Sequence, residues 1–150
     1  MSKIKYFSEN FDIQSKKIIL RLDLNVPLNK KKIQDETRIL QVLPFLKILI
    51  KKKAKIIIVS HLGRPKGQKI NELSLTPIYK FLKERLETNV YFFIGEIDEE
   101  TKNKFSYLKE SEIILLENIR FFKGEIENDN NFAKKLASLG DIYINDAFSC

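Results

Sequence analysis

A short segment at residues 60–67, with the sequence SHLGRPKG, carries side chains that could bind an anion. It contains His61, the single histidine of the chain, together with Arg64 and two glycines. Glycine lets the backbone approach a charged group, and a guanidinium is a planar, permanently charged partner for phosphate or carboxylate. The β-branched run at residues 55–59 predicts a buried strand just before this segment, and ligands of open α/β sheets bind where strands end. The pattern indicates an anion site, with a sharp turn and a solvated Arg64 as the open alternative.

A second polar group follows an earlier predicted strand, at residues 16–22. Asp23 and Asn25 alternate with leucines, so both side chains point to the same side where this strand ends. Pro27 lacks a backbone donor and must lie beyond the strand. A carboxylate and an amide at this place suit the hydroxyl and carboxylate groups of a ligand. An Asx turn at the strand end is the alternative.

The arginines are scarce, 5 against 22 lysines, so their positions are informative. Arg38 falls in the first turn of a helix predicted to open with acidic residues at 35–36, as the helix dipole favours. Arg120, and the pair Asn145 and Asp146, follow two further predicted strands. With the groups above, three arginines and a histidine converge on one sheet edge. They predict a basic pocket for a small, multiply charged anion.

Short apolar runs alternate with helical patterns along the chain, which predicts parallel strands joined by right-handed crossovers. We therefore expect an α/β fold, a three-layer α/β/α Rossmann-like domain with a mainly parallel sheet and no internal domain boundary. Pro44 interrupts the first helical pattern and predicts a kink or two short helices there. The polar stretches at 29–34 and 68–73 predict loops. The predicted strands are 16–22, 55–59, 89–94, 113–116 and 141–144, and the predicted helices are 35–50, 74–86, 96–109 and 132–139.

Composition narrows the class of protein. An apolar share of 43% in 150 residues suits one domain with a proper core, and no apolar run approaches the roughly 18 residues of a membrane helix. The N-terminus lacks the apolar centre of a signal peptide, and the single cysteine, Cys150, excludes an internal disulfide and fits the cytoplasm. The net charge of +7 raises the possibility of a nucleic-acid or polyanion partner, although most of it comes from lysines spread along the chain.

Several familiar motifs are missing from the sequence. The region after Gly63 has the wrong spacing for a mononucleotide P-loop and lacks its Lys-Ser/Thr pair. There is no dinucleotide fingerprint and no Cys/His cluster for a metal. The nucleophile elbow of serine hydrolases is missing too, although the residue types alone do not exclude a serine triad.

The ordered motifs resemble the N-terminal domain of the phosphoglycerate kinase family, over nearly the whole chain from about residue 16 to residue 150. Five motifs occurring in order and at sensible separations are more specific than any one of them. They are RLDLNVP at 21–27, DETRI at 35–39, SHLGRPKG at 60–67, LLENIRF at 115–121 and DIYINDAF at 141–148.

The resemblance implies reversible phosphoryl transfer between 1,3-bisphosphoglycerate and ADP, giving 3-phosphoglycerate and ATP in glycolysis. It implies Mg²⁺ and ATP or ADP held by a second, C-terminal domain, none held by this chain, no metal site here, and a monomer when complete, without nucleic-acid or membrane partners. Arg38 is the implied catalytic residue, facing the transferred phosphoryl group. The implied substrate-binding residues are Asp23, Asn25, Arg38, His61, Leu62, Gly63, Arg64 and Arg120.

The chain also departs from the family pattern. It ends at Cys150, before a further His-Arg pair of the family, and Phe122 stands where a histidine is common. We therefore expect residues 1–150 to be a partial N-terminal phosphoglycerate-binding domain, with a sheet incomplete at its C-terminal end, no nucleotide domain and no activity alone. A basic polyanion- or nucleic-acid-binding domain and a non-catalytic fragment remain the alternatives.

Overall fold

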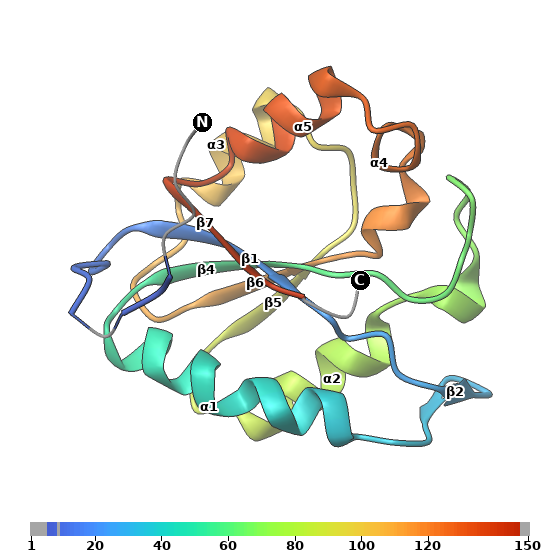
Figure 1. The fold of residues 1–150 in the computed structure, drawn as a ribbon, viewed down its shortest axis with the longest axis horizontal. Coiled ribbons are helices and arrows are strands. Elements are labelled where there is room, and N and C mark those ends of the chain that lie inside the picture. Colours follow the sequence, from blue (N-terminus) through green and yellow to red (C-terminus); the bar gives the residue numbers. More distant parts are fainter. Residues whose placement is uncertain (1–5, 9, 148–150) are drawn as a thin grey trace.

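A five-stranded parallel sheet forms the centre of the molecule (Figure 1). The computed structural model describes residues 6–8 and 10–147. The strand order is β5-β6-β4-β1-β7, and every neighbouring pair is parallel, as the alternation of strands and helices predicts. The strands of this sheet are β1 (Lys17–Leu22), β4 (Lys55–Val59), β5 (Val90–Phe93), β6 (Ile113–Leu116) and β7 (Ile142–Asp146).

Helices cover both faces of the sheet, so the three-layer α/β/α prediction is confirmed (Figure 1). Helices α1 and α2 pack on one face, and α3 and α5 lie over the other. No helix in the described part of the chain is long and apolar enough to cross a membrane. The helices are α1 (Thr37–Lys51), α2 (Thr76–Arg85), α3 (Glu99–Phe105), α4 (Lys123–Ile126) and α5 (Asn130–Ala137), with 3-10 turns η1 (Asn71–Leu73) and η2 (Ile119–Phe121).

Alternate residues of each central strand enter two separate apolar clusters. In β1, Leu20 is fully buried towards α1 and α2, whereas Ile19 packs in the cluster that includes residues of α3 and α5. In β4, Ile58 and Ile57 divide in the same way. Because successive strand residues point to opposite faces, a continuous apolar run is what a strand covered on both sides requires. These two clusters hold the sheet rigidly enough for its ends to position a site.

The first helix corrects two of the predictions. α1 is one helix that includes Pro44, so the alternative of two short helices is wrong, because fully buried residues on both sides of the proline, Ile39 and Leu46, anchor the helix. The helix begins at Thr37, so the acidic residues precede its first turn. Asp35 stabilises that start because its Oδ1 accepts a hydrogen bond from the Thr37 backbone N–H at 2.9 Å.

Three segments predicted as loops, or as sequence beyond a strand, carry regular structure. Strands β2 (Leu28–Asn29) and β3 (Lys32–Ile33) form a small antiparallel hairpin within the predicted loop. Its two turn residues, Lys30 and Lys31, have φ of 49° and 62°, and because neither is glycine the usual hairpin signal is missing. Residues 71–73 form η1, and β7 runs on through Asn145 and Asp146, which were predicted to follow the strand.

Candidate anion-binding site

The predicted site residues lie at the carboxyl edge of the sheet, on segments that leave adjacent strands. Asp23 and Asn25 follow β1, residues 60–67 follow β4, and Arg120 lies in η2 just after β6. Because β1 pairs with β4 and β4 pairs with β6, these three strand ends are neighbours. Arg38 joins them from the first turn of α1.

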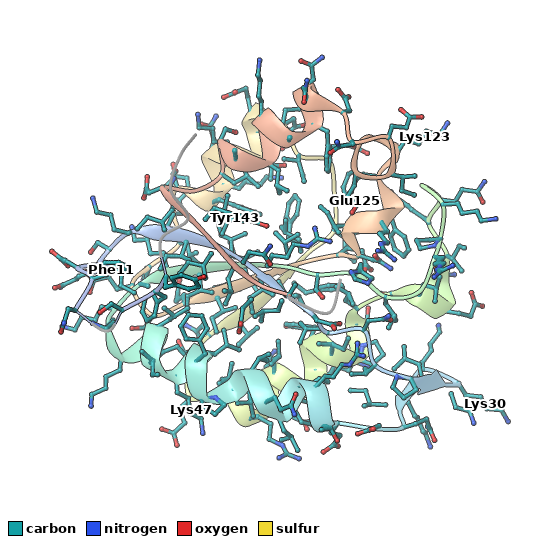
Figure 2. The ribbon with its side chains drawn as sticks, in the orientation of Figure 1. Phe11, Lys30, Lys47, Lys123, Glu125 and Tyr143 are labelled. Atoms are coloured by element: carbon teal, nitrogen blue, oxygen red, sulfur yellow. The ribbon has the colours of Figure 1, made fainter. Side chains whose placement is uncertain are left out.

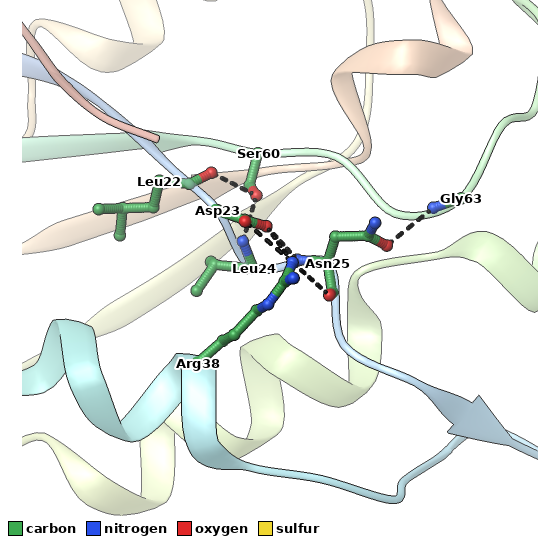
Figure 3. Close-up of polar contacts among 7 residues, drawn as sticks. All are labelled: Leu22, Asp23, Leu24, Asn25, Arg38, Ser60 and Gly63. Carbon is green, nitrogen blue, oxygen red and sulfur yellow. Dashed lines mark hydrogen bonds and ion pairs between the residues drawn. The ribbon is translucent and has the colours of Figure 1, made fainter. Parts of the chain in front are cut away.

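Asp23 and Arg38 form an ion pair at the centre of this edge (Figure 3). Arg38 Nη1 donates to both carboxylate oxygens of Asp23, at 3.0 and 2.9 Å, and to the carbonyl oxygen of Asn25 at 3.1 Å. Asp23 Oδ1 also accepts from the Asn25 backbone N–H at 3.1 Å, so the Asx turn named as an alternative is present as well. These hydrogen bonds of Arg38 all use Nη1, and within the described ranges its remaining guanidinium N–H groups have no hydrogen-bond partner.

Asn25 ties the end of β1 to the glycine-bearing segment after β4. Its Oδ1 accepts from the Gly63 backbone N–H at 3.1 Å (Figure 3). Gly63 has a φ of 62°, and a Cβ at this position would lie 2.7 Å from Cδ2 of Leu73. Both the backbone conformation and the packing therefore require glycine here. Leu62 is buried beside it, so its side chain belongs to the core and only its backbone is available to a ligand.

His61 is buried, with 4% of its surface exposed. Burial, followed by the positive charges of Arg120 and Arg21, lowers the pKa of His61 to about 4, and Asp23 opposes this only in part. The imidazole is therefore neutral at neutral pH. The positive charge of the predicted pocket therefore comes from its arginines, because these arginines and the loss of water disfavour the imidazolium.

The remaining two arginines of the predicted site differ in their surroundings. Arg120 is half-buried, and its Nη1 donates to the Gly63 carbonyl oxygen at 3.1 Å. Arg64 is exposed and makes no hydrogen bond or ion pair within the described ranges. Arg120 is thus held in place, whereas Arg64 is free to turn towards a ligand.

Two buried polar residues that the sequence analysis did not single out organise these segments. Ser60 Oγ donates to the Leu22 carbonyl oxygen at 2.7 Å and accepts from the Leu24 backbone N–H at 3.0 Å, which fixes the backbone on both sides of Asp23 (Figure 3). Asn118 is fully buried and bonds three separate backbone groups. Both residues could have been found from the sequence, because each is a polar residue at the end of a buried apolar run.

Other predicted contributors are less involved. Asn145 is exposed, and its Oδ1 accepts from the backbone N–H of Ala147. Asp146 lies opposite Leu22 in the sheet register, and burial raises its pKa. Within the described ranges, neither side chain makes a hydrogen bond or ion pair with the predicted site residues. Cys150 and the last residue of the 141–148 motif lie outside the described residues.

The lysines are dispersed, in contrast to the arginines. Lys30, Lys47 and Lys123 extend from separate elements into solvent (Figure 2). Arg21 lies nearer the site, and its Nη2 is 3.7 Å from Glu125 Oε1, which reaches it from α4.

Within the described ranges, no three His, Cys, Asp or Glu side chains gather so as to hold a metal ion.

A parallel α/β sheet whose carboxyl edge carries arginines, a buried histidine and a glycine turn is typical of the class of domains that bind a small anion at their strand ends. Comparison with known proteins gives the family. The sequence model of phosphoglycerate kinase matches residues 8–150. The chain therefore belongs to the phosphoglycerate kinase family.

Individual relatives agree with this assignment. Phosphoglycerate kinase from Wolbachia sp. subsp. Drosophila simulans (strain wRi) is 49% identical over 142 residues, which make up 95% of this chain and 35% of the relative. The enzyme from Dictyoglomus turgidum (strain DSM 6724 / Z-1310) is 50% identical over 137 residues, 91% of this chain and 34% of the relative. The chain thus spans about a third of the length of these relatives.

Solved structures give the same result for the fold. Phosphoglycerate kinase from Coxiella burnetii superimposes with a TM-score of 0.80 at 35% identity, covering 94% of this chain and 34% of that chain. The enzyme from Pyrococcus horikoshii OT3 superimposes with a TM-score of 0.78 at 32% identity, covering 93% and 36%.

Proposed function

We propose that this chain forms the phosphoglycerate-binding part of a phosphoglycerate kinase, which transfers a phosphoryl group reversibly between 1,3-bisphosphoglycerate and ADP. The observation that carries the proposal is the convergence of Arg38, Arg120, Asn25 and the Gly63 segment on one edge of a rigid sheet. In parallel α/β sheets this edge is the usual place for a ligand. Membership of the phosphoglycerate kinase family supports a phosphorylated glycerate as this anion.

The binding roles follow from the residue types at this edge of the sheet and, for the arginines, from their number of donors. Asp23 and Asn25 would receive the hydroxyl and carboxylate region of the glycerate. Arg64 and Arg120 would bind its phosphate end or the groups around it, because a guanidinium has five N–H donors and Arg120 uses Nη1 on Gly63. His61 and the backbone of Leu62 and Gly63 would line this region. The neutral imidazole of His61 would contribute a hydrogen bond instead of charge.

Arg38 is the proposed catalytic residue. Its ion pair with Asp23 holds the guanidinium at the rim of the site, with Nη2 and Nε available to a phosphoryl group carried in from outside. Phosphoryl transfer needs little covalent participation from the protein, so positioning and stabilisation of the charge on the transferred group supply most of the catalysis. The carboxylate of the substrate is itself the nucleophile in the direction that consumes ATP.

Nucleotide and Mg²⁺ belong to the complete enzymes of this family. Magnesium, when bound with the nucleotide, neutralises phosphate charge. The described residues offer no cluster of three His, Cys, Asp or Glu side chains that could hold a metal ion. We propose that residues 1–150 correspond to the N-terminal domain and that nucleotide binds to the part of the relatives that this chain does not span. We also propose a cytoplasmic location and a monomeric complete enzyme.

Calorimetric titration tests the proposal with 3-phosphoglycerate and, separately, a random oligonucleotide at physiological salt. We expect one saturable 3-phosphoglycerate site per chain that persists when salt is raised, with oligonucleotide binding that is weaker and strongly salt-dependent. A matched pair of variants localises the site, with Arg120→Ala abolishing the heat of binding and Arg85→Ala, on the exposed side of α2, leaving it unchanged. Tight oligonucleotide binding without 3-phosphoglycerate binding would favour the polyanion-binding alternative.

A further inference from the structure

Asn118 has an unusual set of contacts for a residue beside a binding site. It directly follows β6, and its relative exposure is 0%. Its Nδ2 donates to the carbonyl oxygens of Leu62 at 2.8 Å and Leu73 at 2.9 Å, and its Oδ1 accepts from the Arg120 backbone N–H at 3.1 Å. One carboxamide thus bonds three backbone groups with both its donors and its acceptor.

These three bonds join segments that carry the site. Leu62 lies between His61 and Gly63 in the chain. Leu73 is the last residue of η1, and the side chain of Leu73 packs against Gly63. Backbone bonds join the same segments at their edges, from Ile119 N–H to the Ser60 carbonyl oxygen at 3.0 Å and from Gly67 N–H to the Arg120 carbonyl oxygen at 3.1 Å. The side chain of Asn118 adds its bonds to Leu62 and Arg120 to these two backbone bonds. It holds the segment at 60–67 and the start of η2 at a fixed separation.

We propose that Asn118 is a positioning residue, which sets the distance between the Gly63 segment and Arg120 and so aligns the two groups that bind the phosphorylated ligand. The inference rests on the proposed function for the identity of the ligand. Its physical basis is that ligand affinity depends on groups already held in the bound arrangement, since ordering them on binding costs free energy.

The chemistry of the site selects asparagine at this position. Aspartate has the same shape but no N–H donors, so it would place a carboxylate against two carbonyl oxygens. Leucine would leave the carbonyl oxygens of Leu62 and Leu73 and the N–H of Arg120 buried without this partner. Serine is shorter and offers one donor, so it can replace only part of the set.

The test is calorimetric titration with 3-phosphoglycerate of the 150-residue chain and of Asn118→Ala and Asn118→Ser. We expect the Kd to rise at least about tenfold in Asn118→Ala, with Asn118→Ser between that variant and the wild type. Asn89→Ala is the matched control, because Asn89 Nδ2 also donates to a protein oxygen, Glu112 Oε1 at 3.0 Å, but near the amino ends of the strands. Its Kd should stay within about twofold of the wild type. A folded Asn118→Ala chain with unchanged Kd overturns the proposal.

A spectroscopic readout separates this inference from the proposed function. If the wild-type chain fails to bind 3-phosphoglycerate, the proposed function is wrong, but the NMR signals of the Gly63 and Arg120 amides and of the single histidine still report on positioning. Asn118→Ala must shift all three and Asn89→Ala none of them, and unshifted signals in Asn118→Ala overturn the inference. If the Asn118 variants do not fold, the wild-type carboxamide protons decide, since exchange as fast as that of an exposed asparagine contradicts the hydrogen bonds on which the inference depends.

Discussion

The two ends of the central sheet both carry clusters of polar side chains, but the hydrogen-bonding groups of these clusters are used differently. Near the amino ends of the strands, the carboxylate of Glu112 accepts from Asn89 Nδ2 at 3.0 Å, Tyr91 OH at 3.1 Å and the Lys109 backbone N–H at 2.9 Å. Burial, the largest influence, raises the pKa of Glu112, yet these hydrogen bonds together hold it below its ordinary value. At the carboxyl ends, Arg38 and Arg120 each bond protein through a single nitrogen, Nη1.

The difference separates a structural polar cluster from a binding one. A buried group whose hydrogen bonds are all made within the protein contributes to stability and has little left for a ligand. An arginine that is held by hydrogen bonds from one nitrogen keeps its other N–H donors in position for a ligand. Polarity and burial alone therefore do not mark the site. The binding site is instead marked by hydrogen-bond donors that stay unused on side chains which the protein holds in place.

The largest expected effect is a loss of folding stability in acid, when His61 becomes protonated. The pKa of this imidazole is about 4 in the folded protein and near 6.5 in the unfolded chain, so the unfolded chain binds more protons between these values. The contribution of His61 to stability is therefore complete above about pH 6.5 and is lost as the pH falls towards 4. It amounts to about 3 kcal/mol over this window. Urea unfolding at several pH values should show this loss in the wild type and a smaller one in His61→Gln, and equal slopes would contradict the neutral, buried histidine.

The second prediction removes the proposed catalytic group. In a protein in which this chain replaces the corresponding third of a phosphoglycerate kinase, we expect Arg38→Ala to lower kcat about a hundredfold while changing KM much less. The reason is that the guanidinium meets new charge only as the phosphoryl group moves. Steady-state kinetics measures both constants, with Arg85→Ala as the control, because Arg85 is an exposed arginine that is not among the proposed site residues. A raised KM with unchanged kcat would make Arg38 a substrate-binding residue only.

The third prediction breaks the structural end of the sheet. Glu112→Ala removes the acceptor of three hydrogen bonds and should lower the free energy of unfolding by about 2 kcal/mol. Because this cluster lies at the far end of the strands, affinity for 3-phosphoglycerate should be unchanged in the folded fraction. Denaturant unfolding and calorimetry measure the two quantities. A large loss of affinity would mean that the two ends are coupled and that the contrast drawn above fails.

The smallest expected effect comes from Arg64→Lys. A lysine keeps the charge but replaces a planar fork with a point charge, so we expect the Kd for 3-phosphoglycerate to rise about tenfold without a change in stability. Arg64 is exposed and makes no hydrogen bond or ion pair within the described ranges, so we expect the substitution to have little effect on the fold. An unchanged Kd in calorimetric titration would favour the solvated turn over the binding role.

The strands and their order along the chain could be predicted because each depends on local sequence. The apolar runs at 55–59 and 113–116 have the same bounds in the structure, since a strand covered on both faces must be apolar throughout. The hairpin at residues 28–33 was missed because its turn uses two lysines at positive φ in place of glycine or asparagine. The continuity of α1 through Pro44 depends on tertiary packing, which no local pattern encodes.

The candidate site could also be predicted only in part. Its members could be predicted, because residue type and position after a strand are visible in the sequence. Their partners could not, because the bond from Asn25 to Gly63 joins residues 38 apart in the chain. The neutrality of His61 also depends on burial and on arginines from other segments. Charge state and anchoring are properties of the folded arrangement, and they carry most of the proposed mechanism.

The most direct test of the central claim is a titration of the isotopically labelled chain with 3-phosphoglycerate, followed by NMR. The account predicts saturable shifts at Asp23, Asn25, His61, Gly63 and Arg120, with none at the cluster around Glu112. Inorganic phosphate at the same concentration should give smaller shifts, because it lacks the glycerate groups. Shifts spread over the exposed lysines, or equal responses to both anions, would contradict a phosphoglycerate site at the carboxyl edge of the sheet.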